Sequence, residues 1–536
     1  MGVAGLVILG ALLVYPALRL YVDAPITPAT IDFLLRRDTV ATLRLTILLA
    51  LAVAIAATVI GTGLAYLATR SDLLGRGLFR QAVLLSYFTP SVFLAFAYLV
   101  LMGSNEGPVT RLLRGLSGGK LAVDVMSPGG FVLLGTFEVV PVVFMIVSNA
   151  MASLHGELED VARISGASGL RTSLRVTLPL ALPGIASAAL LSFVNATALY
   201  GIPAVLGVRV ASVAIQGAIS YPFRYDRAAA LTLVLLLIAG SAVIALSVVL
   251  HQQRRFAVIG GRWRPPPVVR LRMTRLFWSV LAWFYVVAAL VAPYVVLLTT
   301  AISRRWTAGP MPGNLTLDHF AAVFTDDVNR HAVVNSPLYG VVAASLGVVL
   351  GGVVAAVIVL SSARWLRAAL DYLVTAAWAF PSIGLGAAYL VTFLHPPVLY
   401  GTPYILILAY LTKFSPLAVR SVAAALQQHG PELREAARIT GESAIGAARR
   451  VTLPLLAPSL IASWILIFVP SIHEVSSSIL LVSPGNETLA VAALFSFESS
   501  AFEVAAALGV IAIVETIAMW ALIQRFRGAG RLRVLS

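Results

Sequence analysis

The chain has 536 residues, of which 59% are hydrophobic and 11% are charged, and its formal net charge is +15. Soluble domains carry about a quarter of their residues as charged side chains, so this composition excludes a water-soluble globular protein and indicates a polytopic membrane protein. The absence of cysteine excludes disulfides, thiolate metal sites and cysteine nucleophiles. Because nearly all the cations are arginines between apolar runs, the charge indicates membrane anchoring and no nucleic-acid partner.

A membrane-spanning helix needs about 20 apolar residues. Twelve segments meet this criterion, near 3–22, 42–68, 80–102, 129–153, 180–203, 229–250, 277–301, 339–360, 370–394, 403–425, 455–482 and 504–524. We therefore expect an all-α fold of about 12 transmembrane helices. The first segment has no basic region before it and no small-residue cleavage site after it, so we interpret it as a retained helix rather than a signal peptide.

The arginines gather in alternate loops between these segments. With a cytoplasmic N-terminus, the inside loops contain 70–80, 163–175, 254–275, 364–367, 434–450 and 525–533, and the opposite side holds about half as many cations. The positive-inside rule thus predicts that both termini lie in the cytoplasm, with the chain in the cell (inner) membrane.

A polar segment occurs twice, once on each side of the middle of the chain. The first copy starts at Glu157 and reads ELEDVARISGASGLRTSLRVTLP, and the second starts at Glu432 and reads ELREAARITGESAIGAARRVTLP; twelve positions are identical without a gap. Further matches pair Pro90-Ser-Val with Pro381-Ser-Ile, Tyr98-Leu-Val with Tyr389-Leu-Val, and Pro141 with Pro416. We infer an internal duplication. Its halves have parallel topology, because six spans return the chain to the same side.

The three prolines that end at Pro267 cannot continue a helix, so they mark the linker between the halves. The predicted organisation is a first helix and outer loop (1–41), a first transmembrane domain (42–250), a cytoplasmic linker (251–276), a seventh helix and outer loop (277–334), a second transmembrane domain (335–524) and a basic cytoplasmic tail (525–536).

Each copy of the repeated segment is predicted to form a helix, a turn and a second helix. In the second copy Gly430-Pro431 breaks the preceding span, and acidic residues favour the first turn of the short helix that follows. Gly441 can supply the left-handed conformation that ends this helix, and Pro454 starts or kinks the next span. Such a short amphipathic helix suits docking into a groove of a cytoplasmic protein. The alternative is a solvated connector.

The repeated segment resembles the EAA loop of binding-protein-dependent ABC importer permeases of the type I fold. The second copy matches this pattern throughout, at Glu435, Ala436, Ala437, Gly441, Val451, Leu453 and Pro454. The first copy departs at Asp160 and Val161, and it matches at Ala162, Gly166, Val176, Leu178 and Pro179. The departures imply unequal contacts at the two positions.

The resemblance implies that each loop is a coupling helix seated on an ATPase subunit. The candidate coupling residues are Glu157, Asp160, Ala162, Arg163, Gly166, Leu178 and Pro179 in the first copy, and Glu432, Glu435, Ala436, Ala437, Arg438, Gly441, Leu453 and Pro454 in the second. The implied partners are two copies of an ABC ATPase subunit, an extracytoplasmic solute-binding protein and the lipid bilayer. The chain lacks a phosphate-binding loop, so it is expected to be no enzyme and to hold no cofactor, with ATP and Mg bound by the partner subunits.

The fused arrangement is most similar to ferric iron, thiamine and 2-aminoethylphosphonate permeases. Segments beginning at Tyr200, His473 and Pro484 favour the ferric iron branch. Ferric iron is therefore the expected substrate, with thiamine, 2-aminoethylphosphonate or a polyamine as alternatives. His473 and Glu474 could contact iron or could form a structural polar cap, and no pattern indicates a bound metal site.

Two ionisable residues lie well inside predicted spans, where charges are costly and often functional. Glu138 and Lys413 occupy matching positions at the offset of the repeated segment, so they are candidates for the pathway or for a pair between the halves. Alternatively, each finds a separate partner. The competing class of protein is an ion-coupled secondary transporter, for which the sequence offers only these two residues and Glu515.

Overall fold

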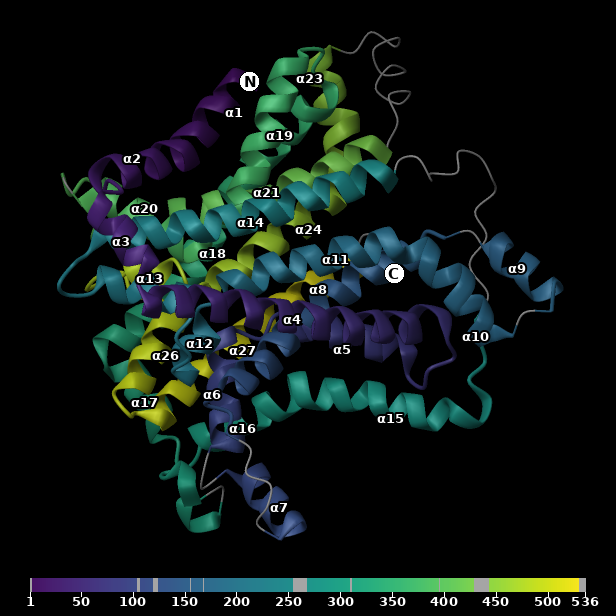
Figure 1. Ribbon diagram of the computed structural model, residues 1–536, viewed down its shortest axis with the longest axis horizontal. Coiled ribbons are helices and arrows are strands. Elements are labelled where there is room, and N and C mark those ends of the chain that lie inside the picture. Colours follow the sequence, from purple (N-terminus) through teal and green to yellow (C-terminus); the bar gives the residue numbers. More distant parts are fainter. Residues whose placement is uncertain are drawn as a thin grey trace. The chain divides into compact units, whose positions relative to one another are not determined.

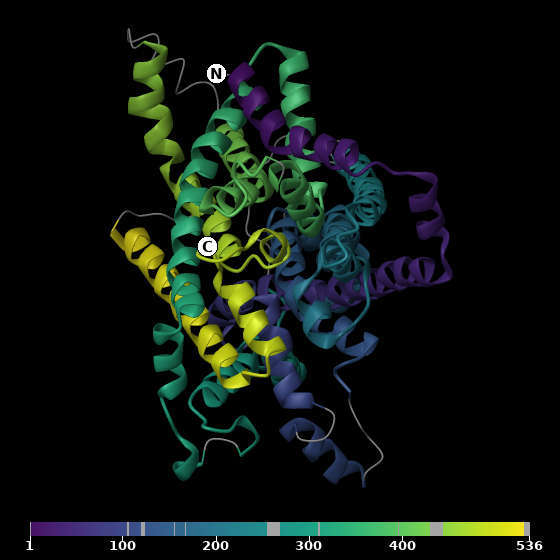
Figure 2. The same cartoon turned by 90° about the vertical axis from the view of Figure 1, so that its left-hand side faces the viewer.

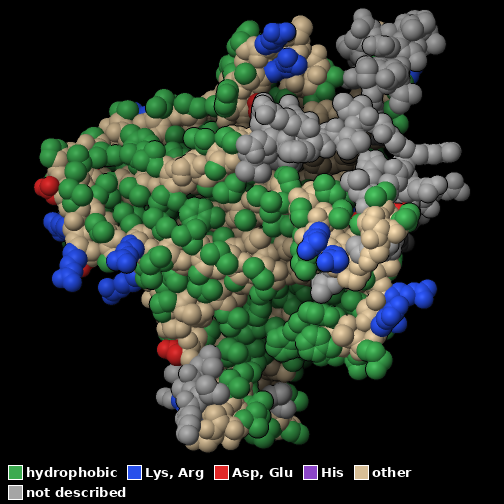
Figure 3. All heavy atoms as spheres, turned by 45° about the vertical axis from the view of Figure 1, so that its right-hand side comes forward, with side chains coloured by type: hydrophobic (Ala, Val, Ile, Leu, Met, Phe, Trp, Pro, Cys, Tyr) green, Lys and Arg blue, Asp and Glu red, His purple; other side chains and the backbone are tan. Residues whose placement is uncertain are grey.

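The computed structural model describes residues 2–103, 107–118, 124–154, 156–166, 168–253, 268–308, 311–394, 396–428 and 443–529. These residues form helices joined by turns and short loops, with no strand beyond isolated bridges among them (Figure 1). Ten helices within them are long and apolar enough to cross a membrane, and two bent helix pairs bring the number to as many as 12. The predicted all-α fold of about 12 spans is thereby confirmed. Apolar side chains cover most of the face in Figure 3.

The helices before the linker follow the chain in a simple order. They are α1 (Gly2–Leu9), the π-helix η1 (Gly10–Val14), α2 (Tyr15–Asp23), α3 (Pro28–Leu35), α4 (Arg37–Arg70), α5 (Arg76–Ser86), α6 (Ser91–Met102), α7 (Pro108–Ser117), α8 (Pro128–Ala152), α9 (Gly156–Ile164), α10 (Gly169–Thr172), the π-helix η2 (Ser173–Thr177), α11 (Leu178–Ala198), α12 (Gly201–Leu206), α13 (Ala211–Ile219) and α14 (Tyr225–Gln253).

The helices after the linker repeat this order. They are η3 (Arg272–Thr274), α15 (Arg275–Val286), the π-helix η4 (Val287–Val291), α16 (Ala292–Ala301), η5 (Trp306–Ala308), η6 (Pro312–Asn314), α17 (Asp318–Thr325), α18 (Asp327–Leu360), α19 (Arg364–Ala379), α20 (Ser382–Leu394), α21 (Pro403–Gln428), α23 (Ala444–Ala447), the π-helix η7 (Ala448–Thr452), α24 (Leu453–Ile472), α25 (Ser478–Leu481), α26 (Leu489–Glu498) and α27 (Phe502–Ala529).

The duplication is visible in the element boundaries. Helices α4 and α18 both have 34 residues. Helices α8 and α21 begin at Pro128 and Pro403, which match at the offset of the repeated segment, and the same offset relates α10, η2 and α11 to α23, η7 and α24. The first half carries the additional helix α7 in the loop between α6 and α8. The repeat therefore extends over nearly every span.

Two of the predicted spans are bent rather than straight. Helices α5 and α6 meet at 102°, and α19 and α20 also meet at 102°. Pro90 and Pro381 lie at these bends, and helix α6 or α20 begins at the next residue. Because proline has no N–H and disfavours a helical residue before it, each span is interrupted at the matched proline.

The helices pack through small residues, as is common where apolar lipid gives no hydrophobic drive for association. A Cβ added to Gly61 of α4 would come within 2.6 Å of Val143 on α8. At the matched place in the second half, a Cβ on Gly351 of α18 would come within 2.5 Å of Ala418 on α21. Close approach of these helices thus depends on glycine in both halves.

Each π-helix is followed by an X-Pro pair, at Pro16, Pro179, Pro293 and Pro454. Because proline cannot donate, the helix before it leaves a carbonyl group without its usual partner. The tyrosines of the repeated Tyr-Leu-Val motif donate at two of these turns. The Tyr98 hydroxyl donates to the Ala288 carbonyl at 2.9 Å, and the Tyr389 hydroxyl donates to the Leu12 carbonyl at 2.8 Å.

Contacts divide the chain into two compact units. One unit contains residues 1–33, 215–232 and 316–536, and the other contains 34–214 and 233–315. In the first unit α1 and α2 lie against α18, α19 and α20 (Figures 1 and 2). In the other unit α15 and α16 pack against α5 and α6. Each half therefore contributes its first span to the unit formed mainly by the other half. The domain boundaries given in the sequence analysis stay a prediction.

Candidate functional site

The first copy of the repeated segment forms the helix, turn and helix expected from its sequence. Helix α9 runs from Gly156 to Ile164, and its last turn is closed by a bond from the Ser165 amide to the Val161 carbonyl at 3.0 Å. Gly166 then has a φ of +82°, which is the left-handed conformation that the sequence predicts for the matched Gly441. The chain returns to the membrane through α10, η2 and α11, and Leu178 and Pro179 are the first residues of α11.

One face of α9 exposes apolar side chains to solvent. Val161 is 62% exposed and Ile164 is 86% exposed, and Asp160 beside them is also exposed. Ala162 is half-buried. Glu157 and Arg163 lie on the helix, but their side chains fall outside the described part of the structure. An exposed acidic and apolar face on a short helix is suited to a protein partner.

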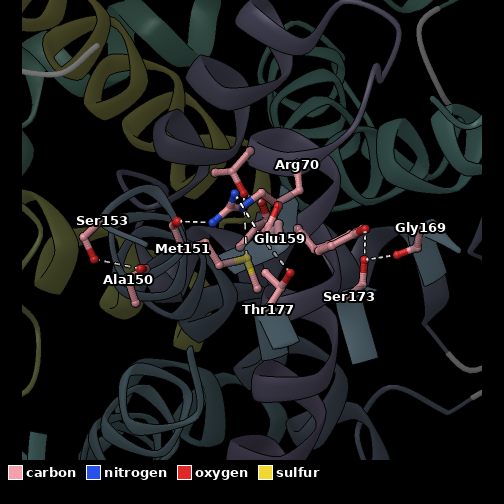
Figure 4. Close-up of polar contacts among 11 residues, drawn as sticks. Arg70, Ala150, Met151, Ser153, Glu159, Gly169, Ser173 and Thr177 are labelled. Atoms are coloured by element: carbon pink, nitrogen blue, oxygen red, sulfur yellow. Dashed lines mark hydrogen bonds and ion pairs between the residues drawn. The ribbon is translucent and has the colours of Figure 1, made fainter. Parts of the chain in front are cut away.

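A buried ion pair holds the opposite face of α9. Arg70, the last residue of α4, places its Nη1 3.1 Å from Oε1 of Glu159, and the two side chains are only 1% and 5% exposed. The Thr177 hydroxyl donates to the same Oε1 at 2.8 Å, and Arg70 Nη2 donates to the carbonyl of Met151 near the end of α8. Figure 4 shows these groups converging on Glu159. Three helices and the π-helix η2 are thus joined by one carboxylate and one guanidinium group.

Further hydrogen bonds surround this pair. The hydroxyls of Tyr66 and Ser173 are hydrogen-bonded to each other, and Ser173 donates to the Gly169 carbonyl at 2.8 Å. Thr69 donates to Sδ of Met151 at 3.7 Å. Helix α4 is therefore connected to η2 through Tyr66 and to α9 through Arg70, by two contacts that lie one helical turn apart on α4.

The chain that follows the linker is fastened to the same end of α4. The Val269 amide donates to the Arg70 carbonyl at 2.8 Å, and Asp72 Oδ1 accepts the Leu271 amide at 2.8 Å. Arg275 Nε donates to the Asp72 carbonyl at 2.7 Å. Arg70 thus holds α9 with its side chain and the strand-like segment before α15 with its backbone.

The second copy of the segment is only partly described. Glu432, Glu435, Ala436, Ala437, Arg438 and Gly441 lie outside the described residues. Leu453 and Pro454 are the first residues of α24, and Leu453 is 51% exposed. The predicted roles of these residues therefore stay a prediction.

The two charges inside predicted spans have identifiable surroundings. Lys413 of α21 donates from Nζ to the Phe380 carbonyl at 2.7 Å and to the Trp378 carbonyl at 3.2 Å. These carbonyls lie at the C-terminal end of α19, where a helix leaves its last carbonyls without amide partners. Glu138 of α8 interacts electrostatically with Tyr87, at the bend between α5 and α6. A direct pair between Glu138 and Lys413 stays a prediction.

The segment that begins at His473, one of those that favour the ferric iron branch, forms a capped turn. Glu474 accepts the Ser477 amide at 2.9 Å and the Ser477 hydroxyl at 3.3 Å, and the His473 ring is 3.1 Å from the Thr516 hydroxyl. These contacts form the structural polar cap, and an iron contact by His473 and Glu474 stays a prediction. Within the described residues there is no group of three or more His, Cys, Asp or Glu that could hold a metal ion.

Sequence reasoning missed Arg70, Glu159 and Thr177 as a set. Thr177 is kept at the matched position as Thr452, but Glu159 is replaced there by Arg434. The last residue of α4 is Arg70, and the last residue of the matched helix α18 is Leu360. The available signal was that the Glu159 carboxylate is replaced by a cation in the other copy, but its partner Arg70 lies 89 residues earlier in the sequence and belongs to none of the repeated motifs.

Comparison with known proteins decides the family. The family model for the "Binding-protein-dependent transport system inner membrane component" matches residues 57–257 and again residues 347–528, which together make up more than half of the chain. The chain belongs to this family. It is a multi-pass inner-membrane permease component in which the type I importer domain occurs twice.

Several curated permeases are similar to this chain. The ferric transport system permease protein FbpB of Actinobacillus pleuropneumoniae is 24% identical over 81% of this chain and 64% of its own length. A putative ferric transport permease of Haemophilus influenzae is 25% identical over 80% of the chain and 68% of its own length. A putative 2-aminoethylphosphonate permease of Salmonella typhi, PhnV, is 28% identical over 44% of the chain and 88% of its own length. The permease thus spans just under two thirds of the length of the first of these relatives.

Proposed function

We propose that this permease forms the membrane pathway of an ATP-driven importer and that ATP hydrolysis takes place in two copies of a separate ABC ATPase subunit. The observation that carries the proposal is the exposed face of α9, with Asp160, Val161 and Ile164, on a loop whose sequence recurs in the second half of the chain. A permease with two such loops can seat one ATPase subunit at each. ATP and Mg then belong to the ATPase subunits, and both chain termini lie on their side of the membrane.

ATP binding and hydrolysis are coupled to movement of the permease through the seating of each coupling helix in an ATPase subunit. If the two subunits close on ATP and open after hydrolysis, each coupling helix moves with the subunit in which it sits. ATP can bias the permease only by the difference in its interaction with the two conformations. The loops supply that difference, because they connect the ATPase surface to the first residues of α11 and α24.

The proposed substrate is ferric iron, delivered by an extracytoplasmic solute-binding protein. Support comes from the two ferric transport permeases that match most of the chain, at 24–25% identity. Thiamine, 2-aminoethylphosphonate and a polyamine remain alternatives, and the phosphonate has a similar permease over one half of the chain. An ion-coupled transporter is the alternative of another class, for which Glu138, Lys413 and Glu515 are the candidate residues.

The test is ATPase activity in proteoliposomes that contain the permease and its ATPase. We expect a binding protein loaded with Fe(III) to stimulate hydrolysis, and we expect the unloaded protein or one loaded with 2-aminoethylphosphonate to stimulate it less. Ile164→Asp places a charge in the exposed apolar face and should abolish stimulation. A permease that recruits no ATPase and transports iron only with an ion gradient would replace this function with ion-coupled transport.

A further inference from the structure

The buried pair of Arg70 and Glu159 lies on the side of α9 away from its exposed face. Both side chains are almost inaccessible, at 1% and 5% exposed. Removing two charges from water is expensive, and the cost is offset only when the pair is well hydrogen-bonded. Here Glu159 also accepts from the Thr177 hydroxyl, and Arg70 donates from Nη2 to the Met151 carbonyl, while Nε and Nη1 of Arg70 make no hydrogen bond within the described residues. Such a network defines one arrangement of the helices that contribute to it.

Helix α9 needs an external anchor to hold a fixed position. It has nine residues, and isolated helices of this length are marginal in water. Val161 and Ile164 are exposed and contribute little packing to the rest of the permease. The Glu159 side chain of this helix is buried. Its carboxylate contacts Arg70 of α4 and Thr177 of η2.

We propose that Arg70 and Glu159 are positioning residues, whose buried ion pair fixes the first coupling helix to the end of α4 so that the helix and the long span move as one body. This inference rests on the proposed function, because α9 is a coupling helix only if an ATPase subunit binds it. It goes beyond the EAA pattern, in which the position of Glu159 does not figure. Neither residue is expected to touch the ATPase or the substrate.

The network also explains how motion reaches the second half of the chain. The Arg70 carbonyl accepts the Val269 amide, and Asp72 accepts the Leu271 amide just before α15 begins. A movement of α4 at Arg70 therefore acts on both α9 and the start of α15. Replacing the Arg70 side chain removes the ion pair with Glu159 but leaves the hydrogen bond from the Val269 amide to the Arg70 carbonyl in place. The two connections can therefore be tested separately.

The second half cannot form the same pair from its matched residues. Arg434 stands where the first copy has Glu159, and Leu360 stands where the first half has Arg70. Anchoring by this ion pair is consequently a property of the first coupling helix. The two ATPase positions are then mechanically unequal even if the two ATPase subunits are identical.

The chain contains no cysteine, so spin labels can be placed without other changes. Labels at Ser165→Cys and Gly77→Cys report the position of the α9 loop relative to α5, because both sites are exposed and a Cβ at Gly77 meets nothing within 4 Å. The distance distribution is measured by pulsed electron spin resonance on the full permease in lipid nanodiscs. No ATPase or substrate is needed for this arm of the experiment.

We expect a narrow distribution for the otherwise unchanged protein and a broadened one for Glu159→Gln and for Arg70→Met, since each single change leaves one buried charge of the pair without its counter-charge. The double variant Arg70→Met with Glu159→Leu removes both charges and should be narrower than either single variant. Asp371→Asn breaks the half-exposed pair of Asp371 with Arg420 and serves as the control without effect. Distributions as narrow in the single variants as in the parent protein would overturn the anchor.

A second readout distinguishes positioning from simple structural support. In proteoliposomes with ATPase and Fe(III)-loaded binding protein, Glu159→Gln should retain the bound ATPase and the basal hydrolysis rate but lose most of the stimulation. Broadening of the distance distribution with unchanged stimulation would overturn the role in coupling. Absence of stimulation in the parent protein would reject the proposed function instead, while the distance measurement would still decide whether the pair anchors α9.

Discussion

The two repeated segments have the same elements after their loops, but the charge at one matched position is reversed, with Glu159 in the first copy and Arg434 in the second. Helices α10 and α23, the π-helices η2 and η7, and the spans α11 and α24 correspond at one constant offset along the chain. In the first half Arg70 and Glu159 form a buried pair, and the second half has Leu360 and Arg434 at those places. Duplication has therefore kept the backbone path, while the residues that could fix the loop to the long helix have diverged.

This difference indicates which part of the segment is common to both halves. The Gly and Leu-Pro positions are identical in the two copies. In the first copy Gly166 makes the left-handed turn, and the Leu-Pro pairs begin α11 and α24. The charge at Glu159 is reversed in the second copy, where Arg434 stands, so the strength with which each loop is held need not be equal. Changes at matched residues test this distinction.

The largest effect is expected from Arg70→Met. It leaves the Glu159 carboxylate buried without its cation, which typically destabilises a protein by about 3–5 kcal/mol. Thermal unfolding of the purified permease should shift clearly downward, and the double variant with Glu159→Leu should recover much of the loss. Leu360→Met at the matched place serves as the control. An equal shift for both variants would contradict the comparison.

A smaller effect is expected from Lys413→Met. The Phe380 and Trp378 carbonyls lose their donor, and a buried group left without a partner costs about 1–3 kcal/mol. The matched variant is Glu138→Gln in the first half. We expect the two losses in thermal stability to add in the double variant. Recovery of transport in the double variant would instead establish the predicted pair between Glu138 and Lys413.

Gly166→Ala tests the turn after α9. At a φ of +82° an alanine is strained by roughly 1–2 kcal/mol, so the loop should shift and binding-protein-stimulated ATPase activity should fall. Gly441→Ala is the matched change in the second copy, and an equal loss of activity would indicate that its turn is the same. Unchanged activity for Gly166→Ala would show that the left-handed turn has no part in coupling.

The smallest effect is expected from Pro179→Ala. The new amide can donate, so the π-helix η2 should relax toward an α-helix while the span itself remains stable. Spin labels on Ser165 and Gly77 should report a small change in mean distance without broadening. The matched variant Pro454→Ala should leave this distance unchanged. A broadened distribution for Pro179→Ala would show that η2 itself helps to hold the loop.

Much of the fold could be predicted because it follows from local chemistry. Apolar length gave the spans, and the constant offset of the repeat gave the duplication. The left-handed conformation was predicted for Gly441, which lies outside the described residues, and the structure shows it at the matched Gly166. The bends at Pro90 and Pro381 were less accessible, because a proline can kink a span or break it completely.

The buried pair could not be predicted for a different reason. Arg70 had the appearance of one more cation at the membrane interface, and Glu159 stood beside the better-known motif position of Asp160. Only the fold brings the end of α4 against η2 and α9. Likewise, Lys413 could be recognised as costly within a span, but its carbonyl partners depend on where α19 ends.

The central claim is that two coupling loops each seat one ATPase subunit. Native mass spectrometry of the complex, purified in lipid nanodiscs through the permease, counts those subunits directly. We predict two ATPase copies for the parent protein, a loss of one copy for Ile164→Asp, and a loss of one copy for the matched change Ile439→Asp. A permease that carries no ATPase subunit, or two copies regardless of both changes, would contradict the claim.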